Sequence, residues 1–594
     1  MNILGISAFY HDSAAALVRD GVLIAAAEEE RFSRIKHDFG YPEHAIAFCL
    51  EQAGITAEDL DYVVYYEKPF LKFERIVTSC VQTFPKSYEV FRESMVAWLS
   101  DKLWVQNLIT DRLDIEPKKV LTIDHHASHA ASAFYPSPFD EAAVLTLDGV
   151  GEWATAAFGT GKGTKLSLTR EIRFPHSLGL LYSAFTAYLG FEVNEGEYKV
   201  MGMAPYGVPR YTDRVWKLLQ LGDDGSFRLD MSYFSFHHSA RHTYNRKFVE
   251  LFGPERPPDL HFFTAASGYP SYFGPKPADY EQVAQRNQHY ADVAASIQRV
   301  TEEVILHMAR ALQKETGLKK LCMAGGVALN SVANSRVLRE TGFDELFIQP
   351  AAGDGGGAVG AALYACHQLL GEPRGFVMKH AYWGKEYSEG QAVDWLRSQN
   401  IPHEIVSSDD ALLDRVVESL MGGQVVGWSQ GRFEWGPRAL GARSILADAR
   451  RADMKDIVNT KIKFREPYRP FAPSVLAEAA ERYFDLPEAC KHSPARFMLY
   501  VVPVRPEHHA TLPAITHVDG SGRLQTVFRD VSARYYALIE RFGHASGVPV
   551  VLNTSFNLKG EPIVTTPANA HNTFTKSDMD LLVLGNVLVR KPRG

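Results

Sequence analysis

Residues 2–31 read NILGISAFYHDSAAALVRDGVLIAAAEEER, and residues 142–174 read AAVLTLDGVGEWATAAFGTGKGTKLSLTREIRF. Each stretch predicts a strand, a turn, a second strand of small residues, a glycine-containing turn and a third strand. Each is followed, after a gap, by segments with helical patterning. Two copies of one plan, three strands and then helices, predict an internally duplicated α/β domain.

This plan resembles the duplicated ribonuclease-H-like halves of actin and the sugar kinases. Halves of that kind close over a nucleotide, with acidic and glycine turns at the strand ends facing its phosphates. Two later segments, 318–338 (LKKLCMAGGVALNSVANSRVL) and 345–365 (ELFIQPAAGDGGGAVGAALYA), each run from a strand into a glycine turn that opens a helix. The alternative explanation for glycines in one such turn is tight packing of the strand against the helix. Two such turns in succession favour nucleotide binding instead.

Residues 123–135, IDHHASHAASAFY, carry three histidines within five positions. In a helix, His125 and His129 lie on one face, and His126 and His129 are three apart and could pair in the same way. The surrounding small residues favour a helix that packs closely on its neighbours. The Glu that zinc proteases place after the first histidine is absent. A metal ligand, a catalytic base and a packed histidine all remain open from this stretch alone.

The bulk composition is that of a soluble globular protein of two large units or three smaller ones. The chain has 594 residues, 46% hydrophobic and 22% charged, with a formal net charge of −7 that argues against general nucleic-acid binding. It begins as a strand, without the pattern of a signal peptide, and no apolar run is long enough for a membrane span. Five scattered cysteines form no CxxC pair or disulfide framework. We therefore expect a cytoplasmic, reduced protein.

The character of the chain changes near residue 376. Basic loops interleaved with aromatics follow, at 425–450 (VVGWSQGRFEWGPRALGARSILADAR) and 458–476 (VNTKIKFREPYRPFAPSVL), and residues 550–564 (VVLNTSFNLKGEPIV) look like a polar ligand loop. Arginines in a rigid, partly buried loop suit an anion pocket, whereas the plain alternative is a solvated basic loop. We expect one domain at 1–375, with an insertion at about 225–290 rich in Pro, Gly and aromatics, and a second at 376–594.

Several motifs together resemble the NodU/CmcH family of O-carbamoyltransferases. They are HDSAAALVRDG, HHASHAASAFY, LDGVGE, YKVMGMAPYG, AGGVALN, GPRALGARSI, YRPFAPSV and NTSFNLKGEPIV, and they occur in the family's order from the first residues nearly to the last. The resemblance implies an actin-like N-terminal domain similar to the tRNA threonylcarbamoyl transferase and a C-terminal α/β domain similar to YrdC. It also implies that carbamoyl phosphate is cleaved to carbamate, which reacts with ATP to give carbamoyl adenylate, from which the carbamoyl group passes to a hydroxyl.

The resemblance implies a metal site on four residues. It selects His125 and His129 over His126 and adds Asp148 and Asp354. Two imidazoles and two carboxylates suit Fe(II), or zinc or manganese, and Mg²⁺ could accompany the ATP.

The remaining implied roles fall into three groups. His11 is implied as the general base for the acceptor hydroxyl, and Lys36 either steadies phosphate or carbamoyl oxygens or is a surface lysine. ATP would be held by Lys199, Gly325, Gly326, Asn330, Gly355 and Gly356. Carbamoyl phosphate would be held by Arg438, Lys463, Arg523 and Lys559.

The expected partners are therefore ATP, carbamoyl phosphate and a hydroxylated small-molecule acceptor, and a homodimer is plausible for a chain of this size. The alternative enzyme is an actin-fold sugar or small-molecule kinase, and a third class is an ATP-gated binding or chaperone module. The basic loops count against both, because neither needs a second anion pocket. The sequence does not specify the acceptor.

Overall fold

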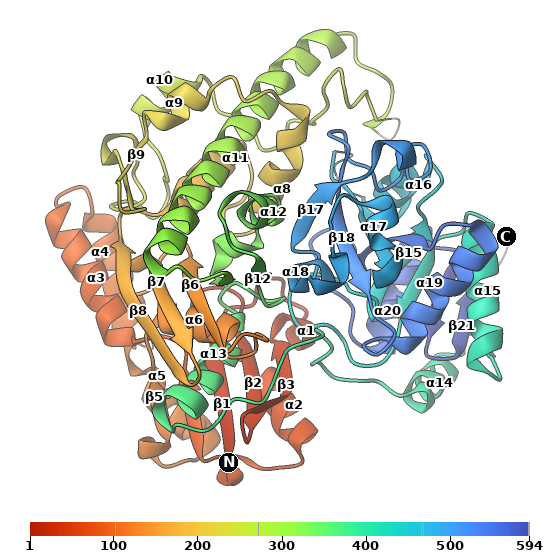
Figure 1. The fold of residues 1–594 in the computed structure, drawn as a ribbon, viewed down its shortest axis with the longest axis horizontal. Helices are drawn as coiled ribbons and strands as arrows, with labels where there is room; N and C mark the ends of the chain where they lie inside the picture. The colour runs from red at the N-terminus through yellow and green to blue at the C-terminus, as the bar shows by residue number, and fades with distance from the viewer. Residues whose placement is uncertain (101, 271–272, 465, 467, 592–594) are drawn as a thin grey trace. The chain divides into compact units, whose positions relative to one another are not determined.

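The computed structural model describes residues 1–100, 102–270, 273–464, 466 and 468–591, so Arg465 and Pro467 of the second basic loop lie outside the described residues (Figure 1). The chain folds into two compact units. Unit 1 comprises Met1–Glu29, Phe39–Ala266 and Ala278–Met378, and unit 2 comprises Glu30–Asp38, Ser267–Pro277 and Lys379–Gly594.

Unit 1 is built on two five-stranded sheets with the same topology. The first has the order β3-β2-β1-β4-β5, with β1, β2 and β3 antiparallel and β4 and β5 parallel to β1. The second has the order β12-β11-β6-β7-β8 and repeats the same pattern of directions. The strands are β1 (Asn2–Ser7), β2 (Ala14–Arg19), β3 (Val22–Glu28), β4 (Tyr62–Tyr65), β5 (Val120–Thr122), β6 (Glu141–Leu147), β7 (Ala154–Lys162), β8 (Lys165–Arg173), β11 (Lys320–Ala324) and β12 (Glu345–Phe347). This strand order confirms the predicted duplicated ribonuclease-H-like fold.

Two helices of small residues occupy the centre of unit 1. Helix α6 (His125–Phe134) packs on β6, β7 and β11, and α13 (Gly356–Tyr364) packs on β1, β2 and β4. The two helices also pack against each other, so each connects one sheet to the other helix. All ten residues of α6 are buried, which confirms the prediction of a closely packed helix.

Glycines set the distances in this centre. A Cβ atom added at Gly5 of β1 would lie 1.8 Å from the carbonyl oxygen of Ala358 in α13. One added at Gly360 of α13 would lie 1.8 Å from the carbonyl oxygen of Ser128 in α6. The backbones therefore approach more closely than any side chain permits.

The other helices of unit 1 are α2 (Glu43–Ala53), α3 (Pro69–Gln82), α4 (Tyr88–Ser100), α5 (Val105–Leu113), α7 (Leu178–Tyr188), α8 (Glu197–Met203), α9 (Thr212–Trp216), α10 (Arg246–Phe252), α11 (Tyr280–Thr316) and α12 (Ser331–Glu340). Among them, α2 packs on β2 and β3, and α11, which has 37 residues, packs on α7, α8, α9 and α12 and on β6 and β7. The region predicted as an insertion, 225–290, contains β10 (Phe227–Leu229), which pairs antiparallel with β9 (Leu219–Leu221) just before the region, and also α10 and the start of α11.

Unit 2 is an α/β domain with a mixed sheet of order β13-β21-β20-β14-β15-β19-β16-β18-β17. Its strands are β13 (Glu404–Ile405), β14 (Val426–Ser429), β15 (Arg443–Asp448), β16 (Ala472–Leu476), β17 (Tyr500–Pro503), β18 (Ser521–Val527), β19 (Val550–Ser555), β20 (Leu581–Leu584) and β21 (Val587–Arg590). Its helices are α1 (Glu30–Ser33), α14 (Glu389–Ser398), α15 (Asp409–Met421), α16 (Met454–Ile457), α17 (Ala480–Tyr483), α18 (Ser493–Arg496), α19 (Ala533–Ser546) and α20 (Pro567–Thr575). The α/β class is confirmed, and the likeness to YrdC stays a prediction.

A hydrophobic core holds α15 and α19 against this sheet. Leu412 and Val416 of α15 and Leu538 of α19 are fully buried with Trp428 of β14 and Val551 of β19. The side chain of Ser408 caps α15 by accepting a hydrogen bond from the amide of Ala411. Among the described residues, no helix is both long and apolar enough to cross a membrane.

The close approach of α6 and α13 predicts that Gly360→Ala lowers the free energy of unfolding by about 1–3 kcal/mol, because the added methyl group meets backbone that must move. Denaturant unfolding measures this loss. Gly375→Ala is the matched control, because a Cβ there meets nothing within 4 Å, and it should change stability by less than about 0.5 kcal/mol. Equal effects of the two substitutions would contradict the packing argument.

Candidate metal centre and the groups around it

Helix α6 presents two imidazoles from one face. His125 opens the helix directly after β5, and His129 follows one turn later. The carboxylate of Glu152 accepts hydrogen bonds from the His125 amide at 3.0 and 3.2 Å and from the Lys68 amide at 2.7 Å, which fixes the start of the helix. Both imidazoles are fully buried.

Two carboxylates reach the same point from turns that follow strands. Asp148 follows β6, and its Oδ1 accepts a hydrogen bond from the Gly326 amide at 3.0 Å. Its Oδ2 faces the imidazoles. Asp354 lies in the turn before α13 and is 1% exposed.

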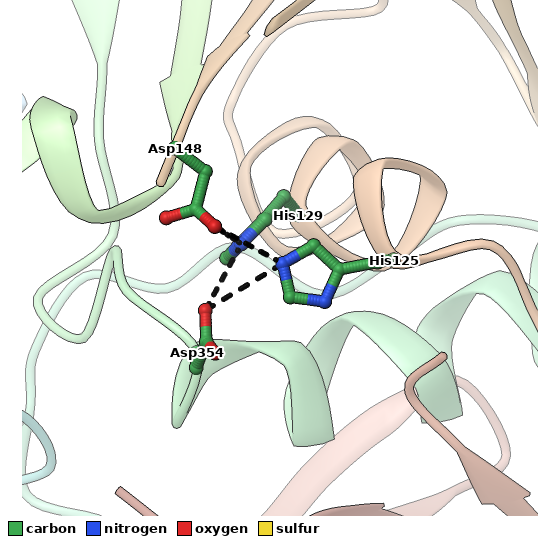
Figure 2. Close-up of side chains that lie close together, drawn as sticks. All are labelled: His125, His129, Asp148 and Asp354. Atoms are coloured by element: carbon green, nitrogen blue, oxygen red, sulfur yellow. Dashed lines mark hydrogen bonds and ion pairs between the residues drawn. The ribbon is translucent and has the colours of Figure 1, made fainter. Parts of the chain in front are cut away.

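Figure 2 shows the four side chains converging on one centre. Nε2 of His125 lies 3.3 Å from Oδ2 of Asp148 and 3.6 Å from Oδ1 of Asp354. Nε2 of His129 lies 4.0 Å and 3.4 Å from the same two oxygens. One ligand atom from each residue lies within 4.8 Å of every other.

The donor set fits a divalent cation. Among the described residues, neither ring nitrogen of His129 and neither oxygen of Asp354 forms a hydrogen bond, although all four atoms are buried. Buried polar atoms without partners are costly, and here Nε2 of His129 and Oδ1 of Asp354 lie 3.4 Å apart in the four-residue cluster. Two imidazole nitrogens and two carboxylate oxygens in such a cluster are the ligands that Fe(II), zinc or manganese take.

His126 is different from its two neighbours in α6. Its Nδ1 lies 2.7 Å from the Thr146 hydroxyl and its Nε2 lies 2.9 Å from the carbonyl oxygen of Ala154, so both ring nitrogens have partners. Burial, assisted by the nearby His125 and His129, lowers the pKa of His126 to about 3. This neutral imidazole holds α6 on β6 and β7.

The charges around His125 favour its protonated form when no cation is bound. Burial lowers the pKa of His125, but the carboxylates of Asp354 and Asp148 outweigh burial and raise it to about 9. Burial also raises the pKa of Asp148, but the hydrogen bond from His125 and the charges of the imidazoles hold it well below its usual range.

Sequence reasoning missed two carboxylates that support the cluster. Glu152 stands in the quoted LDGVGE motif but was not selected, and Glu67 follows β4 without any motif. An oxygen of Glu67 lies 3.8 Å from Nδ1 of His125 and 2.5 Å from the ammonium of Lys72, and both partners of that ion pair are buried. Only the fold brings Glu67 to His125, since 58 residues of chain separate them.

His11 lies beside the cluster in the turn between β1 and β2. Its Nδ1 lies 2.9 Å from an oxygen of Asp12, and its Nε2 lies 3.9 Å from Oδ2 of Asp354. Burial lowers the pKa of His11, but Asp354 and Asp12 outweigh burial and raise it to about 9. A cation on Asp354 would offset that charge and bring the pKa back toward neutrality.

The structure brings some of the residues predicted to hold ATP to the cluster, since Gly326 donates to Asp148 and Gly355 follows Asp354, but it gives others different contacts. The amide group of Asn330 pairs with that of Gln298 at 3.1 Å in both directions, and its oxygen caps α12. Added Cβ atoms would lie 2.1 Å from the carbonyl oxygen of Leu147 at Gly325 and 2.0 Å from that of Ala351 at Gly356. These two glycines therefore also serve packing.

The other three predicted ATP residues are less constrained. Gly326 donates its amide to Asp148, and a Cβ at Gly355 would meet nothing closer than 3.6 Å. Lys199 of α8 is half-buried, with its ammonium 5.7 Å from the ring centre of Phe191.

In unit 2, Lys463 is tied to the polar loop predicted at 550–564. Its ammonium donates to the backbone oxygens of Ser555 at 2.7 Å and Asn557 at 2.8 Å, and to their side-chain oxygens at 3.2 and 2.6 Å. An ammonium has three donors, so these four acceptors use all of them. Lys463 is 4% exposed.

Arg438 lies on a loop that is folded around a buried carboxylate. Oε1 of Glu434 accepts hydrogen bonds from the amides of Leu440 at 2.8 Å, Ala442 at 2.7 Å and Arg443 at 3.1 Å. The buried guanidinium of Arg443 donates to backbone oxygens, including that of Gln430 at 2.9 Å. Glu434, which sequence reasoning missed, thus fixes the segment that carries Arg438.

Arg523 and Lys559 lie in different surroundings. Arg523 is on β18. Burial lowers the pKa of the nearby His517 to about 4, and the charges of Arg523 and Lys455 add to this effect while that of Asp519 opposes it. Lys455 and His517 were not predicted. The side chain of Lys559 is 58% exposed, with its ammonium 3.6 Å from a carboxylate oxygen of Glu466.

Lys36 belongs to unit 2 through the short segment Glu30–Asp38. Its ammonium lies 3.2 and 3.0 Å from the two carboxylate oxygens of Glu30.

Comparison with known proteins gives matches along most of the chain. A family model described as the carbamoyltransferase N-terminus matches residues 2–363, and one described as the carbamoyltransferase C-terminus matches residues 417–591. An uncharacterized protein of Synechocystis sp. is 46% identical over 99% of this chain and 97% of its own length. Nodulation protein NolNO of Sinorhizobium fredii is 38% identical over 98% of this chain and 79% of its own.

Two further similarities cover less of the chain. The 3'-hydroxymethylcephem-O-carbamoyltransferase of Streptomyces clavuligerus is 33% identical over 46% of this chain and 49% of its own. Among solved structures, HypF of T. kodakarensis aligns with 62% of this chain and 48% of its own at 16% identity, with a TM-score of 0.30. That structural likeness is too low to add to the fold assignment, which rests on the strand order.

The geometry of the cluster predicts that His129→Ala protein binds a divalent metal at least about 10- to 100-fold more weakly than the wild-type protein, because one of four ligands is gone. Elemental analysis after dialysis measures the occupancy. His126→Gln is the matched control, since it removes a neighbouring buried histidine that has other partners, and it should keep the metal. Full occupancy in His129→Ala would refute the ligand assignment.

The raised pKa of His125 predicts that metal binding releases protons and weakens as the pH falls. Below pH 9 the imidazole is mainly protonated without metal, and ligation requires its neutral form. The apparent affinity should therefore fall about tenfold per pH unit for each proton displaced. Calorimetric titration with Zn²⁺ in buffers of different ionisation enthalpy counts the protons, and a pH-independent affinity between pH 6 and 8 would contradict the prediction.

Proposed function

This chain belongs to the carbamoyltransferase family, and we propose that it transfers a carbamoyl group to a hydroxyl of a small-molecule acceptor, using ATP and carbamoyl phosphate. Membership confirms the resemblance to the NodU/CmcH proteins and makes the chain an enzyme of the carbamoyltransferase class. The name of the Streptomyces relative gives the acceptor of that protein as a hydroxymethylcephem and the site of transfer as oxygen. By analogy, this chain acts on an alcohol.

The proposed reaction has three steps. Water cleaves carbamoyl phosphate to carbamate and phosphate. A carbamate oxygen attacks the α-phosphorus of ATP, which forms carbamoyl adenylate and releases pyrophosphate. The acceptor hydroxyl then attacks the carbamoyl carbon, loses its proton to a base and releases AMP.

The observation that carries this proposal is the position of His11 between Asp12 and the four-residue cluster. A neutral His11 that donates Nδ1–H to Asp12 keeps Nε2 as a proton acceptor, and this nitrogen faces the side of Asp354. Asp12 therefore orients the ring and stabilises the imidazolium that forms when the acceptor hydroxyl loses its proton. A base in this orientation suits the third step.

His125, His129, Asp148 and Asp354 would hold the divalent metal, which we propose is Fe(II), with zinc or manganese as alternatives. When bound, the metal would supply positive charge beside the phosphates of the nucleotide. Arg438, Lys463, Arg523 and Lys559 remain the proposed contacts of carbamoyl phosphate in unit 2, and Lys463 would have to exchange part of its present hydrogen bonds for the phosphate.

The proposal predicts AMP and pyrophosphate, in equal amounts, when the full chain turns over ATP, carbamoyl phosphate and a hydroxylated acceptor. Labelled carbamoyl phosphate with a panel of alcohols identifies the carbamoylated product, and chromatography separates the nucleotides. ADP as the sole nucleotide product, without carbamoyl transfer, would instead support a small-molecule kinase.

His11→Asn should reduce transfer at least about 10²-fold while metal content and fold persist, because general-base catalysis contributes about 10²–10⁴-fold. His44→Asn is the control, since His44 also pairs with a carboxylate, Glu29 at 2.5 Å, but is largely exposed. Undiminished turnover in the His11 variant would remove its assignment as the base.

A further inference from the structure

Unit 2 contains a cavity that none of the predicted carbamoyl-phosphate residues lines. The space inside it that a water-sized sphere can reach is about 20 Å³, and about 310 Å³ when the open solvent at its mouth is counted. It lies among α18, the end of β18 and residues 379–382. Its polar lining includes Lys379, His380 and Arg496, and none of the described residues that line it is Asp or Glu. Burial and the charge of Arg432 lower the pKa of His380, so the cations here are Lys379 and Arg496. Two cations without a carboxylate in the lining favour an anion.

Arg496 is the cation in this cavity best suited to bind an anion. Its guanidinium carbon lies 3.8 Å from the ring centre of Phe528, so the group lies over an aromatic face. It forms no ion pair with a carboxylate among the described residues. Burial lowers the pKa of Arg496, and the charge of Asp530 opposes this effect. A guanidinium remains charged at neutral pH under such a shift, and its flat fork of donors matches an oxyanion.

Thr526 gives a second, independent indication of a ligand. It is 3% exposed and lines the cavity, and its hydroxyl forms no hydrogen bond among the described residues. The nearby phenol of Tyr382 is, by contrast, satisfied, because it donates to the carbonyl oxygen of Leu440 at 2.7 Å. A buried hydroxyl without a partner requires an oxygen or nitrogen atom from a ligand or water.

We propose that this cavity binds a small oxyanion, a phosphate or carboxylate, attached to a flat apolar body. The guanidinium of Arg496 would donate hydrogen bonds to the oxyanion, and the Thr526 hydroxyl would donate another. Phe497 and Phe528 would contact the apolar part. The enclosed part of the cavity, about 20 Å³, has room for little more than one group of the anion, so the apolar part of the molecule would lie in the open mouth. Arg438, Lys463, Arg523 and Lys559 are not among the residues that line this cavity, and the proposal does not depend on the reaction proposed above.

Calorimetric titration of the full chain with phenyl phosphate tests this site. Arg496→Met keeps an apolar stem over Phe528 but removes the charge, and it should weaken binding at least tenfold. Arg529→Met is the matched control, because Arg529 also lies over an aromatic ring, that of Tyr536 at 4.3 Å, but does not line the cavity. It should leave the affinity unchanged.

Thr526→Val serves as a second variant that keeps the side-chain shape, and it should weaken binding severalfold. Saturating carbamoyl phosphate should leave the affinity for phenyl phosphate unchanged if the two sites are separate. Binding that is insensitive to both substitutions, or that carbamoyl phosphate displaces competitively, would overturn the proposal.

Discussion

The contact between α6 and α13 is the constraint on which the candidate site depends. Gly360 allows the backbone of α13 to touch the carbonyl oxygen of Ser128, and that contact fixes the separation between the two helices. His125 and His129 come from one helix, and Asp354 precedes the other. A shift of 1 Å between the helices would therefore change the distances from Asp354 to both histidines. Precision at the centre comes from glycine and alanine rather than from the charged groups themselves.

The sequence allowed the architecture to be predicted because hydrophobic alternation and turn residues are local features. The repeats at 2–31 and 142–174 became the antiparallel strands of two sheets with one strand order. Supporting groups were not predictable in the same way. Glu67 and Glu434 stand in no motif, and their roles arise only when distant segments meet. The present contacts of Lys463 were hidden for another reason, since a basic loop gives no sign of which backbone oxygens its ammonium will reach.

The three histidines of α6 show that burial alone does not determine whether an imidazole is protonated. His125, His126 and His129 are all buried, but only His126 has conventional partners on both nitrogens. Its pKa falls because burial dominates, whereas that of His125 rises because the carboxylates dominate. Residue spacing left the 125/129 and 126/129 pairs equally open. The structure distinguishes the two pairs, because Thr146 and Ala154 on the neighbouring strands bind His126 and leave His125 and His129 to the cluster.

The ammonium of Lys463 joins two stretches of chain that are more than 90 residues apart in the sequence. Because its donors are all engaged, an anion that captures this lysine must loosen the turn at Ser555–Asn557. Thermodynamic reciprocity then applies: if anion binding frees the turn, any event that frees the turn also strengthens anion binding. Anion binding to Lys463 and release of the turn at residues 555–557 would thus be two sides of one equilibrium. The mobility of residues 555–557 would then report whether an anion is bound to Lys463.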